Sequence, residues 1–449
     1  MFLMVVKTTT RRSVAQGLRG RMFSVSMRRA AFFALGKAVE STPSSRQPRW
    51  VRLLSSSIQV REGATQEANL SSAVTSADPF GHLPAIQASL LTKERNRSPS
   101  EKPENDKLIF GKTFTDHMMC VDWDSRSGWH APKIMPYGDL SMSPAASSFQ
   151  YGLQCFEGMK AYKDADGNVR LFRPELNIRR LNRSMERLHF PTVDEEAMIE
   201  LLGKLVLEDA DWIPEGDGYS LYIRPTAVSS YPYLGVSPAQ SVKLYVILSP
   251  VGPYYKGGFV PVKLYADTVH VRAWPGGMGF AKAGGNYAPT ILPAMKAGKE
   301  HDCEQVLWLF GDEHYITEVG SMNIFFALEK EGGNGTELVT PPLGDEDILE
   351  GVTRRSVLEL AREWDGVEVS ERRITMGEVI RASEEGRLLE AFGTGTAAVV
   401  APVSSIKYQG REIKVPTGSK IGPLAGRVWS TLTDIQYGRV EHPWSVKIS

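Results

Sequence analysis

A single lysine among glycines is the first feature of this sequence that could do chemistry. Lys282 lies in the run Gly276-Gly277-Met278-Gly279-Phe280-Ala281-Lys282-Ala283-Gly284-Gly285-Asn286-Tyr287, which holds five glycines in twelve residues. Glycine lets a backbone pass close to a ligand, and a lysine beside a groove can act as a nucleophilic amine. The run is not a Walker A loop, because no Gly-Lys-Ser or Gly-Lys-Thr tripeptide follows. A solvated lysine and a simple phosphate contact are the alternatives that the pattern leaves open.

Two further segments could bind an anion through backbone N–H groups. The first, Gly393-Thr394-Gly395-Thr396-Ala397-Ala398, also matches the GxGxxA dinucleotide fingerprint, with Glu412 downstream as a ribose ligand, so a dehydrogenase is the alternative enzyme class. That match is weak, because residues 398–403 have the pattern of a strand ending near Pro402, whereas a Rossmann turn opens a helix. The second, Gly351-Val352-Thr353-Arg354-Arg355, precedes an apolar-periodic segment and predicts a helix start, where anions bind. A plain tight turn and an ordinary helix start are the simpler interpretations.

Two charged side chains lie in strand-like sequence. Alternation puts Tyr222 and Arg224 on one face of a strand and the neighbouring apolar residues on the other. Glu318 lies inside the apolar run 316–326, where it is either exposed at an edge or buried with a cationic partner.

The elements that must position these residues follow from periodicity. We predict strands at 169–172, 219–224, 242–248, 305–310, 316–326 and 399–403, and helices at 175–188, 194–207, 288–299, 354–364 and 424–436. A passage dense in glycine and proline at 249–258 separates the two groups of elements. This order predicts a small α+β domain at 106–252, an interdomain connection at 253–270 and a large domain at 271–449, with a cleft between the two domains.

Composition limits the class of protein. The 449 residues are 42% apolar and 23% charged, as in globular chains, and no run of eighteen apolar residues predicts a membrane span. Residues 1–54 carry eleven of the 52 Lys and Arg residues and one of the 52 acids, so the remainder, with 41 bases and 51 acids, is acidic and disfavours nucleic acid. Three dispersed cysteines predict neither a metal site nor a disulfide framework.

The basic, Ser-rich segment 1–54 is typical of a mitochondrial transit peptide and predicts the mitochondrial matrix, with a disordered basic tail as the alternative. Residues 55–105 are polar and aperiodic, which predicts a disordered linker.

Taken in order, these motifs resemble the branched-chain amino-acid aminotransferases, in their eukaryotic mitochondrial type. The resemblance runs from about Lys107 to the carboxyl terminus. It is carried by Phe114-Thr115-Asp116-His117-Met118, Phe156-Glu157-Gly158, Leu171-Phe172-Arg173-Pro174, Tyr222-Ile223-Arg224-Pro225, Thr317-Glu318-Val319-Gly320, Ile435-Gln436-Tyr437-Gly438 and the segments around Lys282, Val352 and Thr396.

The resemblance implies a pyridoxal 5'-phosphate enzyme of fold type IV, a two-domain α+β and α/β architecture like that of D-amino-acid transaminase. Its expected activity is transfer of the amino group between leucine, isoleucine or valine and 2-oxoglutarate (EC 2.6.1.42), in branched-chain amino-acid biosynthesis or catabolism. The expected partners are these amino acids, glutamate and their 2-oxo acids. A homodimer is implied in which one substrate-pocket tyrosine comes from the partner subunit. A non-catalytic relative is disfavoured, because such proteins usually lose the lysine or the acid that this chain retains.

The resemblance also assigns roles to residues. Lys282 would bind the cofactor covalently and move the substrate proton, Glu318 would pair with the ring nitrogen, and Tyr287 would hydrogen-bond the phenolic oxygen. The phosphate ligands would be Arg173, Val352, Thr353 and Thr396, with Arg272 as a further basic group. The substrate pocket would take Phe156, Tyr151 and Tyr222 as its wall, Arg224 for the γ-carboxylate of glutamate, and Thr396, Ala397 and Ser321 for the α-carboxylate.

Overall fold

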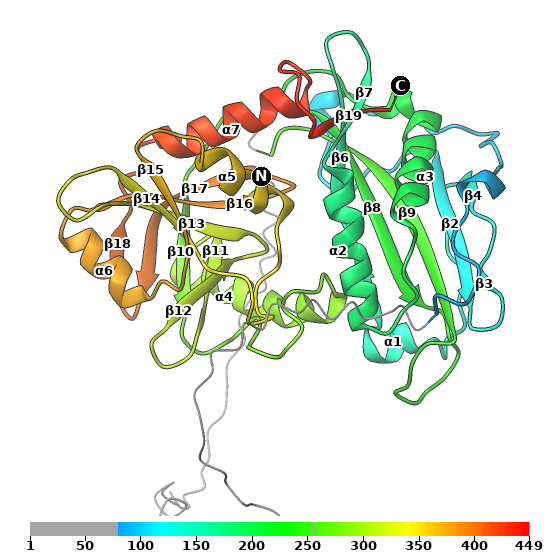
Figure 1. The fold of residues 1–449 in the computed structure, drawn as a ribbon, viewed down its shortest axis with the longest axis horizontal. Coiled ribbons are helices and arrows are strands. Elements are labelled where there is room, and N and C mark those ends of the chain that lie inside the picture. The colour runs from blue at the N-terminus through cyan, green and yellow to red at the C-terminus, as the bar shows by residue number, and fades with distance from the viewer. Residues whose placement is uncertain (1–79, 255–256, 449) are drawn as a thin grey trace, which may run out of the picture. The chain divides into compact units, whose positions relative to one another are not determined.

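The structure, a computed structural model, describes residues 80–254 and 257–448, which belong to one compact unit (Figure 1). The predicted transit peptide 1–54 and residues 55–79 of the predicted linker lie outside the described residues. Two large mixed sheets with flanking helices make up this unit, as the α+β prediction required. In the described part of the chain, no helix is both long and apolar enough to cross a membrane.

The first sheet holds ten strands. Its order is β1 (Thr92–Lys93), β4 (Lys133–Pro136), β2 (His117–Asp124), β9 (Ser241–Val251), β8 (Ser220–Ser229), β6 (Met159–Lys163), β7 (Val169–Phe172) and β19 (Ser445–Lys447), with β3 (Gly128–Trp129) beside β2 and β5 (Gln154–Phe156) beside β8. Every pair except β1 with β4 is antiparallel. The last strand of the chain therefore returns to the sheet that the first half of the chain builds.

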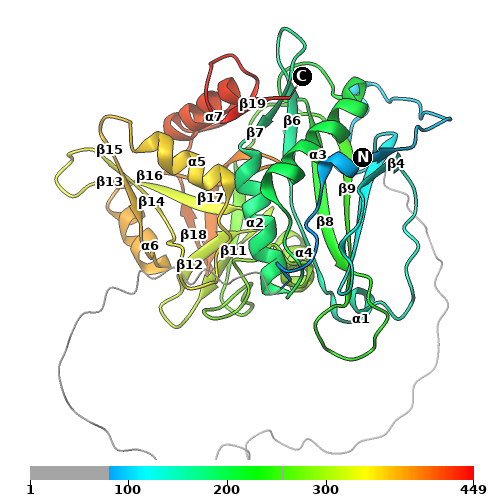
Figure 2. The same cartoon turned by 45° about the vertical axis from the view of Figure 1, so that its right-hand side comes forward.

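Alternation along β8 and β9 decides what this sheet buries. Leu221 and Ile223 of β8 and Leu244 of β9 point into a core that they share with helices α2 (Pro174–Arg187) and α3 (Glu195–Glu208). Both views show the two helices side by side against the sheet (Figure 2). A short helix, α1 (Ser147–Tyr151), precedes β5. Tyr222 and Arg224 therefore face away from this core, as the sequence predicted.

The second sheet holds nine strands. Its order is β12 (Tyr315–Val319), β11 (Gln305–Phe310), β10 (Val262–Asp267), β17 (Val399–Tyr408), β16 (Leu388–Gly395), β13 (Asn323–Glu329), β14 (Thr336–Thr340) and β15 (Val367–Glu371), with β18 (Arg411–Lys414) beside β17. The pairs of β10 with β11 and β17, and of β14 with β15, are parallel.

Helices cover both faces of the second sheet. On one face, α5 (Val352–Ala361) and α7 (Pro423–Gln436) pack on Phe325 and Phe392, and on the other α6 (Met376–Glu384) packs beneath Phe326 (Figure 1). Helix α4 (Ile291–His301) covers β10 and β11. Strand β13 is buried almost throughout because its alternate side chains enter the two cores, which explains why its sequence is continuously apolar.

Most predicted elements are present. The strands at 169–172 and 305–310 are confirmed to the residue, and the helices at 175–188, 194–207 and 424–436 begin and end within one residue of the observed bounds. The single strand predicted at 316–326 is wrong, because the chain turns at Gly320 (φ +55°) and makes β12 and β13. The strand predicted to end near Pro402 continues to Tyr408.

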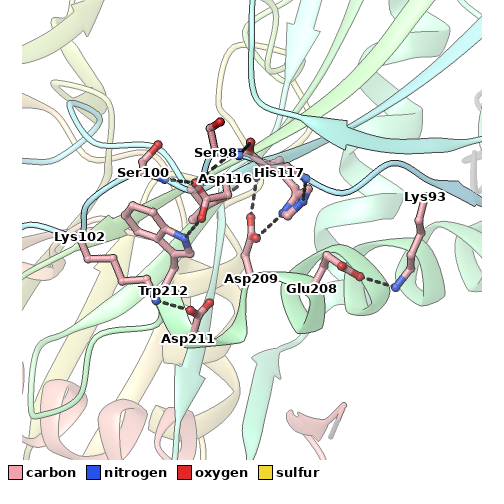
Figure 3. Close-up of polar contacts among 12 residues, drawn as sticks. Lys93, Ser98, Ser100, Lys102, Asp116, His117, Glu208, Asp209, Asp211 and Trp212 are labelled. Atoms are coloured by element: carbon pink, nitrogen blue, oxygen red, sulfur yellow. Dashed lines mark hydrogen bonds and ion pairs between the residues drawn. The ribbon is translucent and has the colours of Figure 1, made fainter.

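Residues 80–105, which composition assigned to the linker, pack on the first sheet. The Ser100 N–H donates to Asp116 Oδ1 (2.7 Å), and the Asn96 N–H donates to His117 Nε2 (3.0 Å). His117 Nδ1 in turn lies 2.7 Å from Asp209 Oδ1, so three elements meet at one buried network (Figure 3). Polar composition alone did not reveal this segment's structure, because its partners are polar groups distant in sequence.

Candidate active site

Lys282 is fixed by hydrogen bonds on both sides of its backbone. Its N–H donates to Ser184 Oγ of α2 (2.8 Å), and its carbonyl accepts from the Phe156 N–H of β5 (3.0 Å). The 3-10 turn η5 (Gly284–Asn286) then brings Tyr287 back toward the lysine, and a second 3-10 turn, η6 (Ala288–Thr290), follows Tyr287. Lys282 Nζ donates to Tyr287 Oη at 3.2 Å, so the five-residue spacing seen in the sequence becomes a direct contact.

The glycine-rich run before Lys282 packs closely against another segment of the chain. A Cβ at Gly279 would overlap the carbonyl oxygen of Asp347. The Phe280 N–H donates to Glu346 O (3.0 Å), which fastens the run to the loop that leads into α5. The glycines therefore serve packing between the lysine segment and the start of α5.

A pocket of about 370 Å³ opens around Lys282. Arg224 Nη2 donates to Tyr222 Oη (3.0 Å), and the Arg224 guanidinium lies 4.8 Å from the ring centre of Phe156. Lys282 Nζ lies 5.0 Å from the centre of that same ring, so both cations lie close to Phe156. The predicted site residues that line this pocket are Phe156, Tyr222, Arg224, Lys282, Tyr287, Ser321, Thr396 and Ala397.

Gly158 leaves room for the side chain of Tyr222. A Cβ at this position would overlap Tyr222 Oη, so only glycine allows the phenol to lie against β6. The carbonyl of Gly158 also accepts from Thr396 Oγ1 (3.2 Å), which ties this strand to the turn after β16.

Glu318 and Arg272 form a buried ion pair. Glu318 Oε2 lies 2.6 Å from Arg272 Nη1, and the side chains are 3% and 2% exposed. Glu318 Oε1 accepts from Asn323 Nδ2 and from the Leu349 N–H, both at 3.2 Å. Oε2 receives no hydrogen bond of good geometry from any described residue. Burial raises the pKa of Glu318, although Arg272, the Leu349 N–H and Lys282 all act to lower it.

A second buried pair, which the sequence did not single out, lies between α2 and the lysine. Arg180 Nε and Nη2 donate to the two oxygens of Glu157 at 2.7 and 2.8 Å, and Arg180 Nη1 donates to Glu350 O (2.8 Å). Burial acts to raise the pKa of Glu157, but the charge and hydrogen bonds of Arg180 leave it below its usual value, with Lys282 acting in the same direction. Arg180 also lines a cavity of about 140 Å³ with Gly351 and Val352 at the start of α5.

Two predicted site residues lie elsewhere. Arg173 (φ +46°) precedes α2, and its guanidinium pairs with Glu359 Oε2 (2.8 Å) and stacks 4.1 Å from the ring centre of Trp444. Tyr151 is 45% exposed and donates to Leu234 O, outside the Lys282 pocket of this chain. The signal for Arg180 was its position in α2, where the polar residues Asn177, Arg180 and Ser184 share one face of the helix.

The remaining predicted site residues lie at the start of α5 and in the turn after β16. Val352 and Thr353 begin α5 and are buried. Residues 396–398 form the turn between antiparallel β16 and β17, where Lys160 Nζ donates to Ala397 O (2.9 Å). No helix opens at this turn, so the dehydrogenase interpretation of the GxGxxA match is wrong.

Known proteins share this architecture and sequence. Residues 154–406 match the amino-transferase class IV family. The chain is 49% identical to a branched-chain-amino-acid aminotransferase of Monosiga brevicollis, over 84% of this chain and 96% of that protein. It is 48% identical to the mitochondrial and 47% identical to the cytosolic branched-chain-amino-acid aminotransferase of Saccharomyces cerevisiae, over 81% of this chain and 94% and 98% of theirs.

Solved structures have the same fold. The branched-chain aminotransferase of the archaeon Thermoproteus uzoniensis with norvaline matches with a TM-score of 0.56 and 26% identity, over 74% of this chain and 100% of that one. The branched-chain amino acid aminotransferase of Thermobaculum terrenum in its PLP form, at 22% identity, shares the fold with a TM-score of 0.59, over 75% of this chain and 99% of that one.

Proposed function

Because this chain belongs to the class IV branched-chain-amino-acid aminotransferases, we propose that it transfers amino groups in the pocket around Lys282. The enzyme is a pyridoxal-phosphate-dependent aminotransferase (EC 2.6.1.42). The observation that carries the site assignment is the contact of Lys282 Nζ with Tyr287 Oη beside a buried carboxylate, that of Glu318.

The residues present fit pyridoxal phosphate. Glu318 has a buried carboxylate oxygen, Oε2, that is ion-paired with Arg272 but receives no hydrogen bond of good geometry among the described residues, and a protonated ring nitrogen is a donor that suits it. When bound, the cofactor supplies a carbonyl that accepts the amino group and a ring that withdraws electrons from the substrate. We assign Tyr287 Oη to the phenolic oxygen, and the charge of Arg272 acts to lower the pKa of Glu318, which favours its ionised form.

Lys282 then has two tasks at one atom. Its Nζ would hold the cofactor, and the same amine, once free, would take the proton from the substrate Cα. The hydrogen bond to Tyr287 and the fixed backbone at Ser184 and Phe156 limit the movement of the side chain between these tasks. The proton therefore stays on a group inside the pocket.

For the phosphate we assign Arg180 in place of Arg173. Arg180 reaches the start of α5, where the N–H groups of Val352 and Thr353 belong to the first turn and make no bond within the helix. Thr396, which the resemblance also assigns to the phosphate, lines the Lys282 pocket. Arg173 is instead ion-paired with Glu359 of α5. Arg180→Met should weaken cofactor binding, and Arg173→Met should leave it unchanged, as measured by cofactor titration.

For the substrate, Phe156 and Tyr222 offer an apolar wall to an aliphatic side chain. Arg224 is within reach of that wall and can pair with the γ-carboxylate when glutamate enters. Ser321, Thr396 and Ala397 line the pocket where the α-carboxylate would lie. One pocket thus accepts both kinds of side chain.

A homodimer would complete this site. Near Tyr151, the side chains of Leu234 and Val236 are 65% and 78% exposed, and a second apolar group begins α4 at Ile291 and Leu292, which are 62% and 56% exposed. Exposed apolar side chains of this kind are typical of a subunit interface. We assign Tyr151 to the pocket of the partner subunit, and expect Leu292→Glu to shift the mass measured by light scattering toward one chain.

We also propose that residues 1–54 direct the chain to the mitochondrial matrix, followed by a linker from residue 55. Support comes from the basic, Ser-rich composition of 1–54 and from the mitochondrial Saccharomyces relative, although the cytosolic relative is almost as similar. Import of a reporter fused to residues 1–54 tests this. The division into a small domain at 106–252, a connection at 253–270 and a large domain at 271–449 is part of the same proposal, with the connection contributing β10 to the second sheet.

The decisive experiment replaces the lysine. Lys282→Ala should abolish transfer of the amino group from leucine to 2-oxoglutarate, because no other amine reaches Tyr287 among the described residues. Lys299→Ala, at an exposed position of α4, is the matched control and should keep full activity. Wild-type turnover by Lys282→Ala would refute the assignment.

A further inference from the structure

A tight turn between β12 and β13 places two polar residues opposite each other beside the candidate active site. Strand β12 ends at Val319 and β13 begins at Asn323, and Val319 exchanges backbone hydrogen bonds with Met322 across the turn (2.9 and 2.8 Å). The next pair of residues outward is therefore Glu318 with Asn323, whose side chains leave the same face of the two strands. Both residues are buried, with exposed fractions of 2% and 5%.

Asn323 holds one oxygen of the Glu318 carboxylate. Its Nδ2 donates to Glu318 Oε1 (3.2 Å) and to the Leu349 carbonyl (2.9 Å), while the Leu349 N–H donates to the same Oε1 (3.2 Å). The other oxygen, Oε2, faces Arg272 at 2.6 Å. The carboxylate cannot rotate without breaking both hydrogen bonds at Oε1, so Asn323 and Leu349 together decide which oxygen is turned toward Arg272.

The amide oxygen of Asn323 lies against the residue that precedes α5. A Cβ added at Gly351 would overlap Asn323 Oδ1. The backbone of Gly351 (φ −69°, ψ 131°) is one that any residue adopts, so the space taken by Asn323, rather than the local chain conformation, requires glycine here. Gly351 is followed directly by Val352 in the turn that we assign to the cofactor phosphate. One side chain thus contacts the segments at both ends of the site.

We propose that Asn323 is a positioning residue that sets the Glu318 carboxylate relative to the phosphate-binding start of α5. On one side its amide N–H groups hold Glu318 and the Leu349 carbonyl, and on the other its oxygen borders Gly351. The inference rests on the proposed function, in which Glu318 meets the ring nitrogen of pyridoxal phosphate and the first turn of α5 meets its phosphate. Asn323 acts through these two neighbours and needs no contact of its own with the cofactor.

Two effects of Asn323 favour a proton on the ring nitrogen. A hydrogen bond donated to Glu318 Oε1 stabilises the charged carboxylate, and a negative charge beside the ring nitrogen favours the protonated form of that nitrogen. The fixed orientation of the carboxylate also keeps Oε2 available. Without Asn323, both Glu318 Oε1 and the Leu349 carbonyl lose a donor, and the carboxylate is free to turn. The proton then shifts away from the ring nitrogen.

The test reads the ring nitrogen of the bound cofactor by NMR. The full chain is loaded with pyridoxal phosphate that is isotope-labelled at this nitrogen, and its chemical shift, measured without substrate, reports whether it carries a proton. Asn323→Ala should move the resonance toward that of an unprotonated ring nitrogen. It should also lower kcat for leucine about tenfold with KM little changed, which is the effect of one hydrogen bond to a charged group. A purely structural role would lower the free energy of unfolding and leave the resonance in place.

Gly351→Ala perturbs the same residue from the phosphate end and removes no hydrogen-bond donor. Its Cβ displaces the Asn323 amide, so the resonance should move in the same direction although the change is made at the other end of the site. In the Asn323→Ala background the obstructing oxygen is gone. The double variant should therefore match Asn323→Ala alone, because both changes act through one contact.

Asn182→Ala is the matched control. The Asn182 amide, in α2, donates to Val193 O and accepts from the Val193 N–H, both at 2.9 Å, so this variant also loses two hydrogen bonds but none to Glu318. It should keep the wild-type resonance and kcat. An unchanged resonance in Asn323→Ala would overturn the proposal, as would an effect of Gly351→Ala that persists in the double variant. A wild-type chain that binds no pyridoxal phosphate would instead refute the proposed function, so the two failures are distinct.

Discussion

The buried pair of Glu157 and Arg180 provides a direct test of how the site is built. Glu157→Gln keeps the size and shape of the side chain and removes its charge. Arg180 is 6% exposed, so it would be left as a buried cation, since the substituted amide can accept only a neutral hydrogen bond from it. Removing one partner of a buried ion pair destabilises a protein by about 3–5 kcal/mol. We expect that loss in the free energy of unfolding at pH 7.

The neighbouring residue supplies the control. Arg179 Nε lies 2.9 Å from Glu195 Oε2, but these side chains are 57% and 37% exposed. Glu195→Gln makes the same chemical change at an exposed pair, and should cost at most about 1 kcal/mol. Comparing the losses in the free energy of unfolding of the two variants therefore separates the effect of burial from that of the ion pair itself.

Urea unfolding gives the free energy of unfolding of both variants. The protein is used without cofactor, because a bound cofactor phosphate would offer Arg180 a second anion and hide the loss of the Glu157 charge. The pKa of Glu157 is lowered in the folded state, so its contribution is complete above the ordinary glutamate pKa of about 4.3 and is lost as the pH falls through the folded value. The difference between wild type and Glu157→Gln should thus shrink in acid. Equal losses in the buried and the exposed variants would refute the reasoning.

Three further outcomes follow from the site. Gly158→Ala should lower kcat/KM for leucine about tenfold or more, because the new Cβ displaces the Tyr222 phenol. Lys160→Met should abolish a rise in stability of ~3 kcal/mol that wild type shows from about pH 8 to 10.4, because burial lowers the lysine pKa from 10.5 to about 8 and the unfolded chain binds the extra proton in that range. Glu318→Gln should lower kcat by roughly 10²–10³ with little change in cofactor affinity.

Each of these has its own check. Gly138→Ala, where a Cβ meets nothing within 4 Å, should leave kcat/KM unchanged, and equal effects at both glycines would contradict the steric argument. For Lys160, urea unfolding at several pH values is compared with wild type, and parallel curves would contradict the burial of a charge. For Glu318, loss of cofactor binding in an absorbance titration, rather than of turnover, would contradict a role at the ring nitrogen.

Local sequence determined much of the site, because strand alternation and helix starts are short-range properties. The period of β8 put Tyr222 and Arg224 on one face, and the Gly351–Thr353 motif marked the start of α5 before any contact was known. The family motifs also identified Lys282, Tyr287 and Glu318. In the fold, Lys282 contacts Tyr287 directly, and its charge acts on the pKa of Glu318.

Tertiary structure alone decided which groups meet. Arg173 and Arg180 look alike in sequence, but packing of α2 against α5 pairs the first with Glu359 and turns the second toward Glu157. Residues 80–105 have the composition of a linker, yet Asp116 and His117, distant in sequence, pair with their backbone. Sequence sets the face on which a side chain lies, whereas the residue that it meets depends on long-range packing.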